Sequence, residues 1–172
     1  MSDPLTDAER RQCWRTPLDL WGLLQDIYRF DIDAAADSKS ALLPIWFGPN
    51  HPTPEMRDGL AVRWADHGSR VYCNPGFGNP GPWAIKGINA VRQDHGRIDL
   101  YVQMSLIAAQ AKWWGNYTMA ADEIIMLSPR PQFVAPPGIK QSGNARENCL
   151  LVYRQGPTIP NSTPRVRLWR WG

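Results

Sequence analysis

The stretch that decides the fold reads V-Y-C-N-P-G-F-G-N-P-G-P-W over residues 71–83. Its first three residues are typical of the end of a short buried strand. The run from Asn74 to Pro82 continues neither a strand nor a helix, because proline lacks a backbone N–H and glycine leaves the backbone free. Residues 83–91 then have a helical pattern. A polar amide in a rigid turn at the carboxyl end of a strand is typical of a ligand site in an α/β sheet, although Asn-Pro-Gly alone is more often a simple β-turn.

The length and composition predict one folded domain spanning residues 1–172. A hydrophobic fraction of 43% and nine tryptophans favour a globule with a real core. Residues 1–13 are polar and are expected to form a loose arm or a short helix. Residues 155–172 form a basic and aromatic tail that ends in Trp169-Arg170-Trp171. This tail suits either nucleic-acid binding or packing onto the body.

The formal charge of +3 is small but unevenly distributed. Acidic residues predominate before Val71, whereas the part after Pro129 is rich in arginine and contains Glu147 as its one acid. This asymmetry suggests that a polyanion docks on one face, with an ordinary solvated surface as the alternative.

Cysteine and histidine positions bear on the compartment and on metal binding. Cys13, Cys73 and Cys149 are odd in number and far apart, and the three histidines lack ligand-like spacing. Both facts oppose a zinc site and a disulfide framework and favour a reducing cytoplasm. No segment has the length of a membrane helix, and the N-terminus lacks a signal-peptide pattern. The expected location is the cytoplasm of a bacterial host, with no metal and no membrane partner.

Two further segments are expected to flank the ligand end of the sheet. A helix is expected to start at Thr16-Pro17, with Thr16 as its cap and Pro17 in its first turn. Residues 28–33 alternate as a strand that ends in Asp33-Ala34-Ala35-Ala36-Asp37. Small residues after a strand-terminal acid let a ligand approach the backbone closely, and the acid can hold an ammonium group or ribose hydroxyls. The alternative is a surface acid that caps the next turn.

The remaining pattern predicts the fold class. Strands are expected at 98–104, 123–127, 132–134 and 149–153, and helices at 83–95 and 107–114, with loops over 38–57 and 135–147. The early alternation of strands and helices predicts an α/β sheet with helices on both faces. The later crowding of strands predicts an antiparallel edge.

These pieces resemble the small phage-type DNA N6-adenine methyltransferases, a Dam-like family. The resemblance runs from about Trp14 to Arg154 and is carried by the order and spacing of several short motifs. They are Trp14-x-Thr16-Pro17, Phe30-x-Ile32-Asp33-Ala34-Ala35, Asp58-Gly59-Leu60 with Trp64, Tyr72-Cys73-Asn74-Pro75, Trp83-x-x-Lys86, Lys112-Trp113-Trp114, Glu123-Ile124, Arg130-x-x-Phe133 and Leu150-Leu151-Val152-Tyr153-Arg154.

The resemblance implies a Rossmann-like sheet that binds S-adenosyl-L-methionine and methylates the N6 amine of adenine in double-stranded DNA. Asn74, Pro75 and Phe77 stand at the family's catalytic signature, which is Asn or Asp, Pro, Pro and an aromatic. Asp33-Ala34-Ala35 occupies the place of the usual glycine-rich cofactor loop. Residues expected at the cofactor are Thr16, Pro17, Asp33, Ala34, Ala35, Asp37 and Asn74.

In this interpretation, the Asn74 side-chain oxygen and the Pro75 carbonyl accept the two hydrogens of the amine, and Phe77 stacks on a flipped-out base. Gly76 departs from the second proline of the signature. Two alternatives therefore stay open: a catalytically impaired relative that still binds DNA or the cofactor, and a cytosine-N4 methyltransferase, which uses the same acceptors. Trp113-Trp114 suits either a DNA wedge or core packing. The target sequence and the oligomeric state are not encoded in these motifs.

Overall fold

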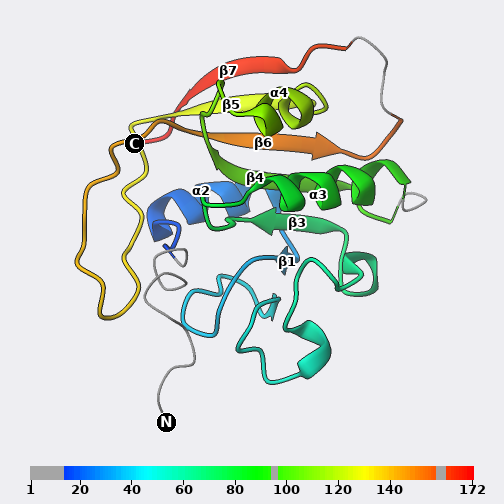
Figure 1. Cartoon of the computed structure of the whole chain (residues 1–172), viewed down its shortest axis with the longest axis vertical. Coiled ribbons are helices and arrows are strands. Elements are labelled where there is room, and N and C mark those ends of the chain that lie inside the picture. The colour runs from blue at the N-terminus through cyan, green and yellow to red at the C-terminus, as the bar shows by residue number, and fades with distance from the viewer. Residues whose placement is uncertain (1–13, 94–96, 158–161) are drawn as a thin grey trace.

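The computed structural model describes residues 14–93, 97–157 and 162–172. In these ranges the chain forms one seven-stranded sheet with the order β2-β1-β3-β4-β6-β5-β7 (Figure 1). The strands, in chain order, are β1 (Ile32–Asp33), β2 (Ile45–Trp46), β3 (Arg70–Cys73), β4 (Leu100–Leu106), β5 (Glu123–Ser128), β6 (Asn148–Arg154) and β7 (Arg165–Arg170). The expected arm over residues 1–13 lies outside the described residues.

Most neighbouring strands in this sheet are parallel. β1 pairs in parallel with β2 and β3, β3 with β4, and β5 with β7, whereas β6 runs antiparallel to both β4 and β5. The predicted α/β class is confirmed. The antiparallel strand lies inside the sheet, and the described edges are β2 and β7. The burial pattern explains this: β6 is buried at every position but its last, as a central strand requires, whereas β7 is exposed at alternate positions.

Helices cover both faces of the sheet, as predicted (Figure 1). α2 (Leu18–Tyr28) packs on one face, where its buried side chains meet those of β3, β4, β5 and β6. α3 (Gly81–Gln93) and α4 (Lys112–Thr118) pack on the other. Successive strand residues point to opposite faces, so Tyr72 joins the core under α2 while Val71 and Cys73 join the core under α3. Two short turns, η1 (Pro54–Met56) and η2 (Trp64–Asp66), lie between β2 and β3.

Several predicted boundaries were wrong, each for a local reason. Thr16 does not cap α2: Pro17 is the N-cap residue and makes no side-chain cap, while Asp19 Oδ1 accepts the Leu20 N–H in the first turn at 2.8 Å. The strand expected over 28–33 is reduced to β1, because Tyr28 still belongs to α2 and Arg29 ends that helix in the left-handed conformation with φ 50°. The helix expected over 107–114 is α4, shifted toward the C-terminus, and the expected strand at 132–134 is one isolated bridge between Val134 and Arg15.

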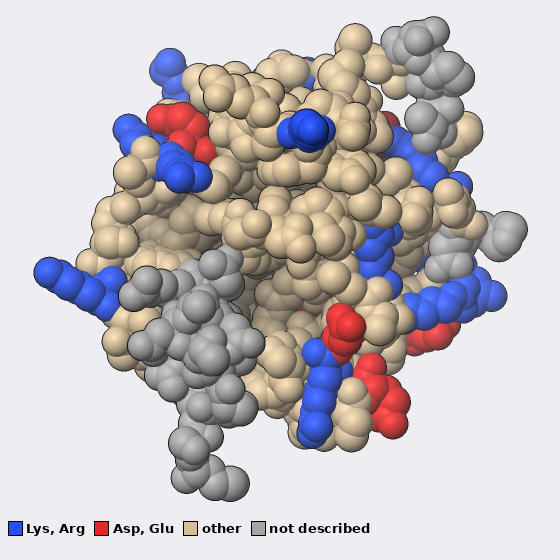
Figure 2. Space-filling model, viewed as in Figure 1, with Lys and Arg blue, Asp and Glu red and all other residues tan. Residues whose placement is uncertain are grey.

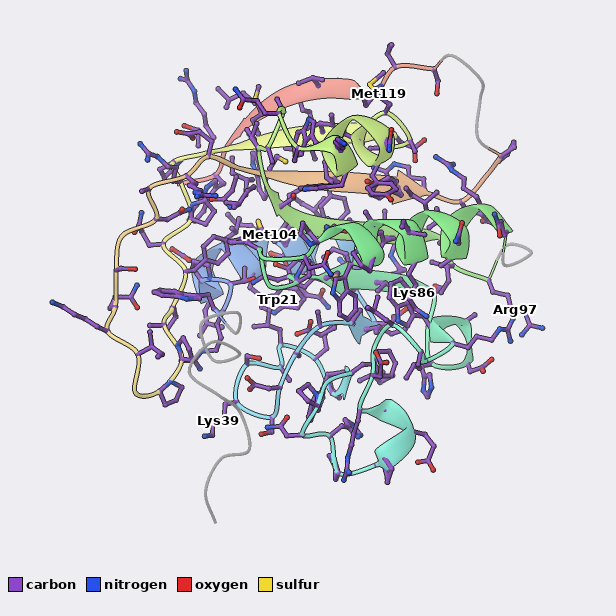
Figure 3. The ribbon with its side chains drawn as sticks, in the orientation of Figure 1. Trp21, Lys39, Lys86, Arg97, Met104 and Met119 are labelled. Carbon is purple, nitrogen blue, oxygen red and sulfur yellow. The ribbon has the colours of Figure 1, made fainter. Side chains whose placement is uncertain are left out.

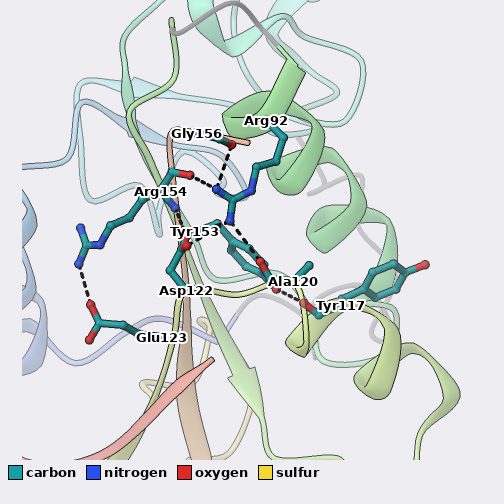
Figure 4. Close-up of polar contacts among 8 residues, drawn as sticks. All are labelled: Arg92, Tyr117, Ala120, Asp122, Glu123, Tyr153, Arg154 and Gly156. Carbon is teal, nitrogen blue, oxygen red and sulfur yellow. Dashed lines mark hydrogen bonds and ion pairs between the residues drawn. The ribbon is translucent and has the colours of Figure 1, made fainter. Parts of the chain in front are cut away.

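Arg92 on α3 forms hydrogen bonds at the C-terminal end of β6 (Figure 4). Its Nη1 donates to the carbonyl oxygens of Arg154 at 2.8 Å and Gly156 at 3.1 Å. Its Nη2 donates to the Asp122 carboxylate at 3.1 Å and to the Ala120 carbonyl at 3.4 Å. The side chain of Arg92 is only 11% exposed, so its removal leaves several acceptors without a partner in a largely dry setting.

We expect Arg92→Met to lower the free energy of unfolding by about 2–3 kcal/mol, less than for a fully buried pair because Asp122 is partly exposed. Urea denaturation of the purified protein measures this. Arg130→Met is the matched control, since its ion pair with Glu147 is exposed and such pairs contribute ~0–1 kcal/mol. Equal effects of the two substitutions would show that the Arg92 network does not stabilise the fold.

Candidate active site

The candidate site lies where the order of the strands in the sheet changes direction. From β1 the chain places β2 on one side and β3 on the other, so the carboxyl ends of β1 and β3 flank a topological switch point, the usual ligand position in open α/β sheets. Asp33 is the last residue of β1, and Asn74 follows β3 directly. Both line one cavity of roughly 240 Å³, hereafter the first cavity.

A second cavity of roughly 350 Å³ adjoins the first. It is lined by Pro75 and Phe77 from the turn after β3, by Phe133, and by residues 142–146 of the loop before β6. Phe77 meets Phe133 edge-on, with ring centroids 5.5 Å apart and planes at 77°. Trp14 and Asn74 line both cavities, so the Asn74 side chain stands at the junction between them.

Hydrogen bonds fix the orientation of the Asn74 amide. Its Nδ2 donates to the carbonyl oxygen of Trp14 at 3.0 Å and to Oγ1 of Thr16 at 3.2 Å. Thr16 Oγ1 also shares a hydrogen bond of 2.7 Å with the hydroxyl of the buried Tyr72. Within the described ranges, neither Asn74 Oδ1 nor the Pro75 carbonyl oxygen accepts a hydrogen bond. Two acceptors in consecutive residues are therefore left for another molecule.

Asp33 is a buried acid at the base of the first cavity. Asp33 is only 3% exposed. Burial raises the pKa of its carboxyl group from 3.8 to about 7, and hydrogen bonds from the backbone amides of Leu42 and Ala35 oppose this rise. Oδ2 accepts the Leu42 N–H at 3.1 Å. Asp37 lines the same cavity, and its Oδ1 caps the turn that follows by accepting the N–H groups of Lys39 and Ser40. A cation entering the cavity would restore the ionised form of Asp33.

The first cavity collects most of the residues predicted at the cofactor. Thr16, Asp33, Ala35, Asp37 and Asn74 line it. Two predicted residues do not: Pro17 caps α2, and Ala34 is fully buried in the core. The three predicted catalytic residues, Asn74, Pro75 and Phe77, all line the second cavity. Their roles stay predictions.

Comparison with known families decides the wider assignment. Residues 4–163 match the family described as DNA N-6-adenine-methyltransferase (Dam). The chain belongs to this family. No curated protein matches it. A Dam-family match over nearly the whole chain agrees with the mixed α/β sheet and with the resemblance that the motifs carry.

Two motifs of the Dam resemblance had no role assigned from the sequence: Asp58-Gly59-Leu60 with Trp64, and Trp83-x-x-Lys86. In the structure they contact each other. The Trp64 indole N–H donates to the Gly59 carbonyl at 2.9 Å. From α3, Lys86 Nζ donates to the Val62 carbonyl at 2.6 Å and lies 4.9 Å from the Trp64 ring centroid (Figure 3). A Cβ on Gly59 would stand 2.2 Å from the Ala34 carbonyl oxygen, so only glycine fits there. Of these two motifs, Asp58, Gly59 and Trp83 line the first cavity, whereas Trp64 and Lys86 do not.

Sequence reasoning missed several other residues of the site. Arg15, Phe47, Gly48, Arg57 and Asp58 also line the first cavity. They come from the segment between β2 and β3 and from the position between Trp14 and Thr16. Loop residues carry no periodic signal, so only their spatial grouping identifies them.

The charged residues on the surface are less segregated by sign than the sequence suggested. On the face seen in Figure 2, Lys and Arg stand in separate small groups, several of them beside Asp or Glu. Arg154 and Arg167 both pair with Glu123, and Arg130 pairs with Glu147. The expected polyanion-binding face stays a prediction. Among the described residues, no helix could span a bilayer, and no group of His, Cys, Asp and Glu could hold a metal ion.

Proposed function

We propose that the protein transfers a methyl group from S-adenosyl-L-methionine to the N6 amine of a flipped-out adenine in DNA. Membership of the Dam family supports the reaction class. The observation that carries the site assignment is the state of the Asn74 amide: its N–H groups are both engaged, its oxygen accepts no hydrogen bond from a described residue, and the residue lines both cavities.

The catalytic role follows from the chemistry of the amine. The N6 nitrogen is a weak nucleophile because its lone pair is delocalised into the ring. Asn74 Oδ1 and the Pro75 carbonyl accept its two hydrogens, which draws the nitrogen toward a tetrahedral shape and aims its lone pair toward the first cavity. Catalysis in this scheme rests on positioning and on fixed dipoles, without a strong general base.

The donor set of the first cavity fits S-adenosyl-L-methionine. Asp33 suits the ammonium of its amino-acid end, and Asp37 suits the ribose hydroxyls through Oδ2, since Oδ1 is engaged in a turn. Ala35 has no side chain beyond Cβ to keep a ligand from the backbone. When bound, the cofactor supplies an electrophilic methyl group on a sulfonium centre.

The second cavity suits the flipped base. Phe77 offers a face for stacking, which typically contributes ~1–3 kcal/mol per base. Phe133 packs against Phe77 with the two ring planes at 77°, which fixes the orientation of the Phe77 ring. Flipping costs roughly a few kcal/mol of lost stacking and pairing, and contacts to phosphates must offset it. Arg146, which lines this cavity, is placed for such a contact.

The test is transfer of a labelled methyl group from S-adenosyl-L-methionine to unmethylated double-stranded DNA, followed by nucleoside analysis. We expect N6-methyladenine. N4-methylcytosine would instead support the cytosine alternative. A folded protein that binds the cofactor but labels no DNA would support the impaired relative.

Gly76 is the feature that motivates the impaired alternative, and its backbone permits a direct test. Gly76 is not among the described residues with positive φ, and its N–H makes no hydrogen bond to a described residue, so a proline there would break no hydrogen bond to those residues and would not need a left-handed backbone. We expect Gly76→Pro to change the methylation rate by less than about threefold, because hydrogen bonds from Asn74 to Trp14 and Thr16, and not turn stiffness, hold the amide. Steady-state kinetics measure this. A gain of about a hundredfold, the typical loss from a misplaced catalytic group, would show that glycine impairs turnover.

A further inference from the structure

Arg15 has a guanidinium group that the described protein does not satisfy. The residue lines the first cavity, and Nη1 donates to the Lys39 carbonyl at 3.2 Å. Its Nε is buried and has no hydrogen-bond partner, and no described carboxylate forms an ion pair with it. An arginine cannot lose its proton under ordinary conditions, so this charge persists. The guanidinium charge therefore has no counter-ion among the described residues.

The backbone holds Arg15 firmly in place. Its N–H donates to the Val134 carbonyl at 3.0 Å, and the Val134 N–H donates back to the Arg15 carbonyl at 2.9 Å. On either side, the Trp14 carbonyl and the Thr16 hydroxyl hold Asn74. The guanidinium is thus presented from a segment that is fixed between the two cavities, and little ordering is needed before it binds.

The first cavity is lined by both acidic and basic side chains, so it can bind a cation and an anion. Asp33 suits a cation at the base of the cavity. Two arginines line it, and each makes one hydrogen bond to a described carbonyl: Arg57 from Nε to His51 at 2.8 Å, and Arg15 from Nη1 to Lys39 at 3.2 Å. Arg15 is the one whose chain neighbours, Trp14 and Thr16, hold the Asn74 amide. The amino-acid end of the methyl donor carries one ammonium and one carboxylate, which matches the Asp33 and Arg15 side chains.

We propose that Arg15 binds the carboxylate of the methyl donor, beside an ammonium held by Asp33. This inference rests on the proposed function and adds the group that selects the donor's amino-acid end. Arg15 stands at the unspecified position of Trp14-x-Thr16-Pro17, so the resemblance assigns it no role.

The proposal is tested by calorimetry, which measures the affinities of two ligands and does not depend on catalytic activity. The ligands are S-adenosylhomocysteine and its decarboxylated analogue, which keeps the nucleoside, the sulfur and the ammonium. We expect the native protein to bind the decarboxylated analogue about 10- to 100-fold more weakly, the range for a charge-assisted hydrogen bond. In Arg15→Met the affinity for S-adenosylhomocysteine should fall to that of the analogue, and the difference between the ligands should vanish. Arg97→Met, at an exposed position that lines neither cavity, should keep the full difference.

The outcomes separate the proposal from the function on which it rests. Equal binding of both ligands by the native protein would overturn the Arg15 contact and leave the methyltransferase assignment intact. The same holds if Arg15→Met weakens both ligands equally, which indicates a structural role or an arginine satisfied by water only. Failure of the native protein to bind S-adenosylhomocysteine at all would overturn both. The native-protein comparison can overturn the contact without any variant, and Arg15→Gln takes the place of Arg15→Met if the latter does not fold.

Discussion

Asn74→Ala should lower the rate of DNA methylation by about 10²–10³-fold, the usual effect of removing one preorganised hydrogen-bonding group from a reacting centre. The substitution removes Oδ1 at the junction of the two cavities, and with it one of the two acceptors for the amine. It also removes the hydrogen bonds to Trp14 and Thr16, so the free energy of unfolding should fall by about 1–2 kcal/mol. Single-turnover kinetics and urea denaturation measure the two effects separately.

The same loop offers a matched control. Asn79 also precedes a proline but is exposed and lines neither cavity. Asn79→Ala should leave both the rate and the stability close to those of the native protein. A fivefold change in rate corresponds to a change of ~1 kcal/mol in the activation free energy. If the rate of Asn74→Ala is within about fivefold of the native rate, the acceptor role of Asn74 is wrong.

Asp33→Asn should have opposite effects on cofactor affinity and on stability. Loss of the carboxylate removes the partner of the donor's ammonium, so S-adenosylhomocysteine should bind about 10- to 100-fold more weakly at pH 8. At the same pH the unliganded variant should be more stable than the native protein, by on the order of 2 kcal/mol, because it no longer holds a desolvated carboxylate. Calorimetry and urea denaturation at several pH values measure these effects.

The pH dependence follows from the raised pKa of Asp33. Its pKa is about 7 in the folded protein and near 3.8 in an unfolded chain, so the folded state binds more protons between these values. The native protein therefore loses stability as the pH rises from about 4 to 7, and Asp33→Asn should not show this loss. At pH below 4 the two proteins should differ little.

Cofactor affinity should change in the other direction. Because the ammonium needs the ionised acid, the affinity of the native protein should rise by up to about tenfold per pH unit below the pKa and level off above it. Asp26→Asn, an exposed position on α2, should keep both native pH profiles. A flat affinity profile in the native protein would contradict the placing of the ammonium at Asp33.

The local sequence predicted the parts of the site that lie in one stretch. The strand, the Asn-Pro turn and the following helix all occur where residues 71–83 placed them. The acid at the end of β1 faces the same cavity because parallel strands end at one edge of a sheet. Trp113 and Trp114 are partly buried and pack against the core on the face of the sheet that α3 and α4 cover, as the core-packing alternative expects, and a DNA contact by their exposed parts stays a prediction.

What the sequence could not predict depends on contacts between distant residues. Thr16 was expected to cap a helix, yet its hydroxyl orients the amide of Asn74, which lies 58 positions away. Nothing near Thr16 signals that partner. The basic tail likewise joins the sheet as β7 beside β5, with Trp169 packed against the core under α2, because its alternating pattern suits a half-exposed edge strand.

The most direct test of the central claim is a crystal structure with sinefungin, an unreactive donor analogue whose amine replaces the methyl-bearing sulfonium. We predict its amino-acid end between Asp33 and Arg15, and the replacing amine directed toward Asn74 Oδ1 at the opening to the second cavity. Sinefungin bound away from the first cavity, or an Asn74 oxygen turned away from that opening, would contradict the account.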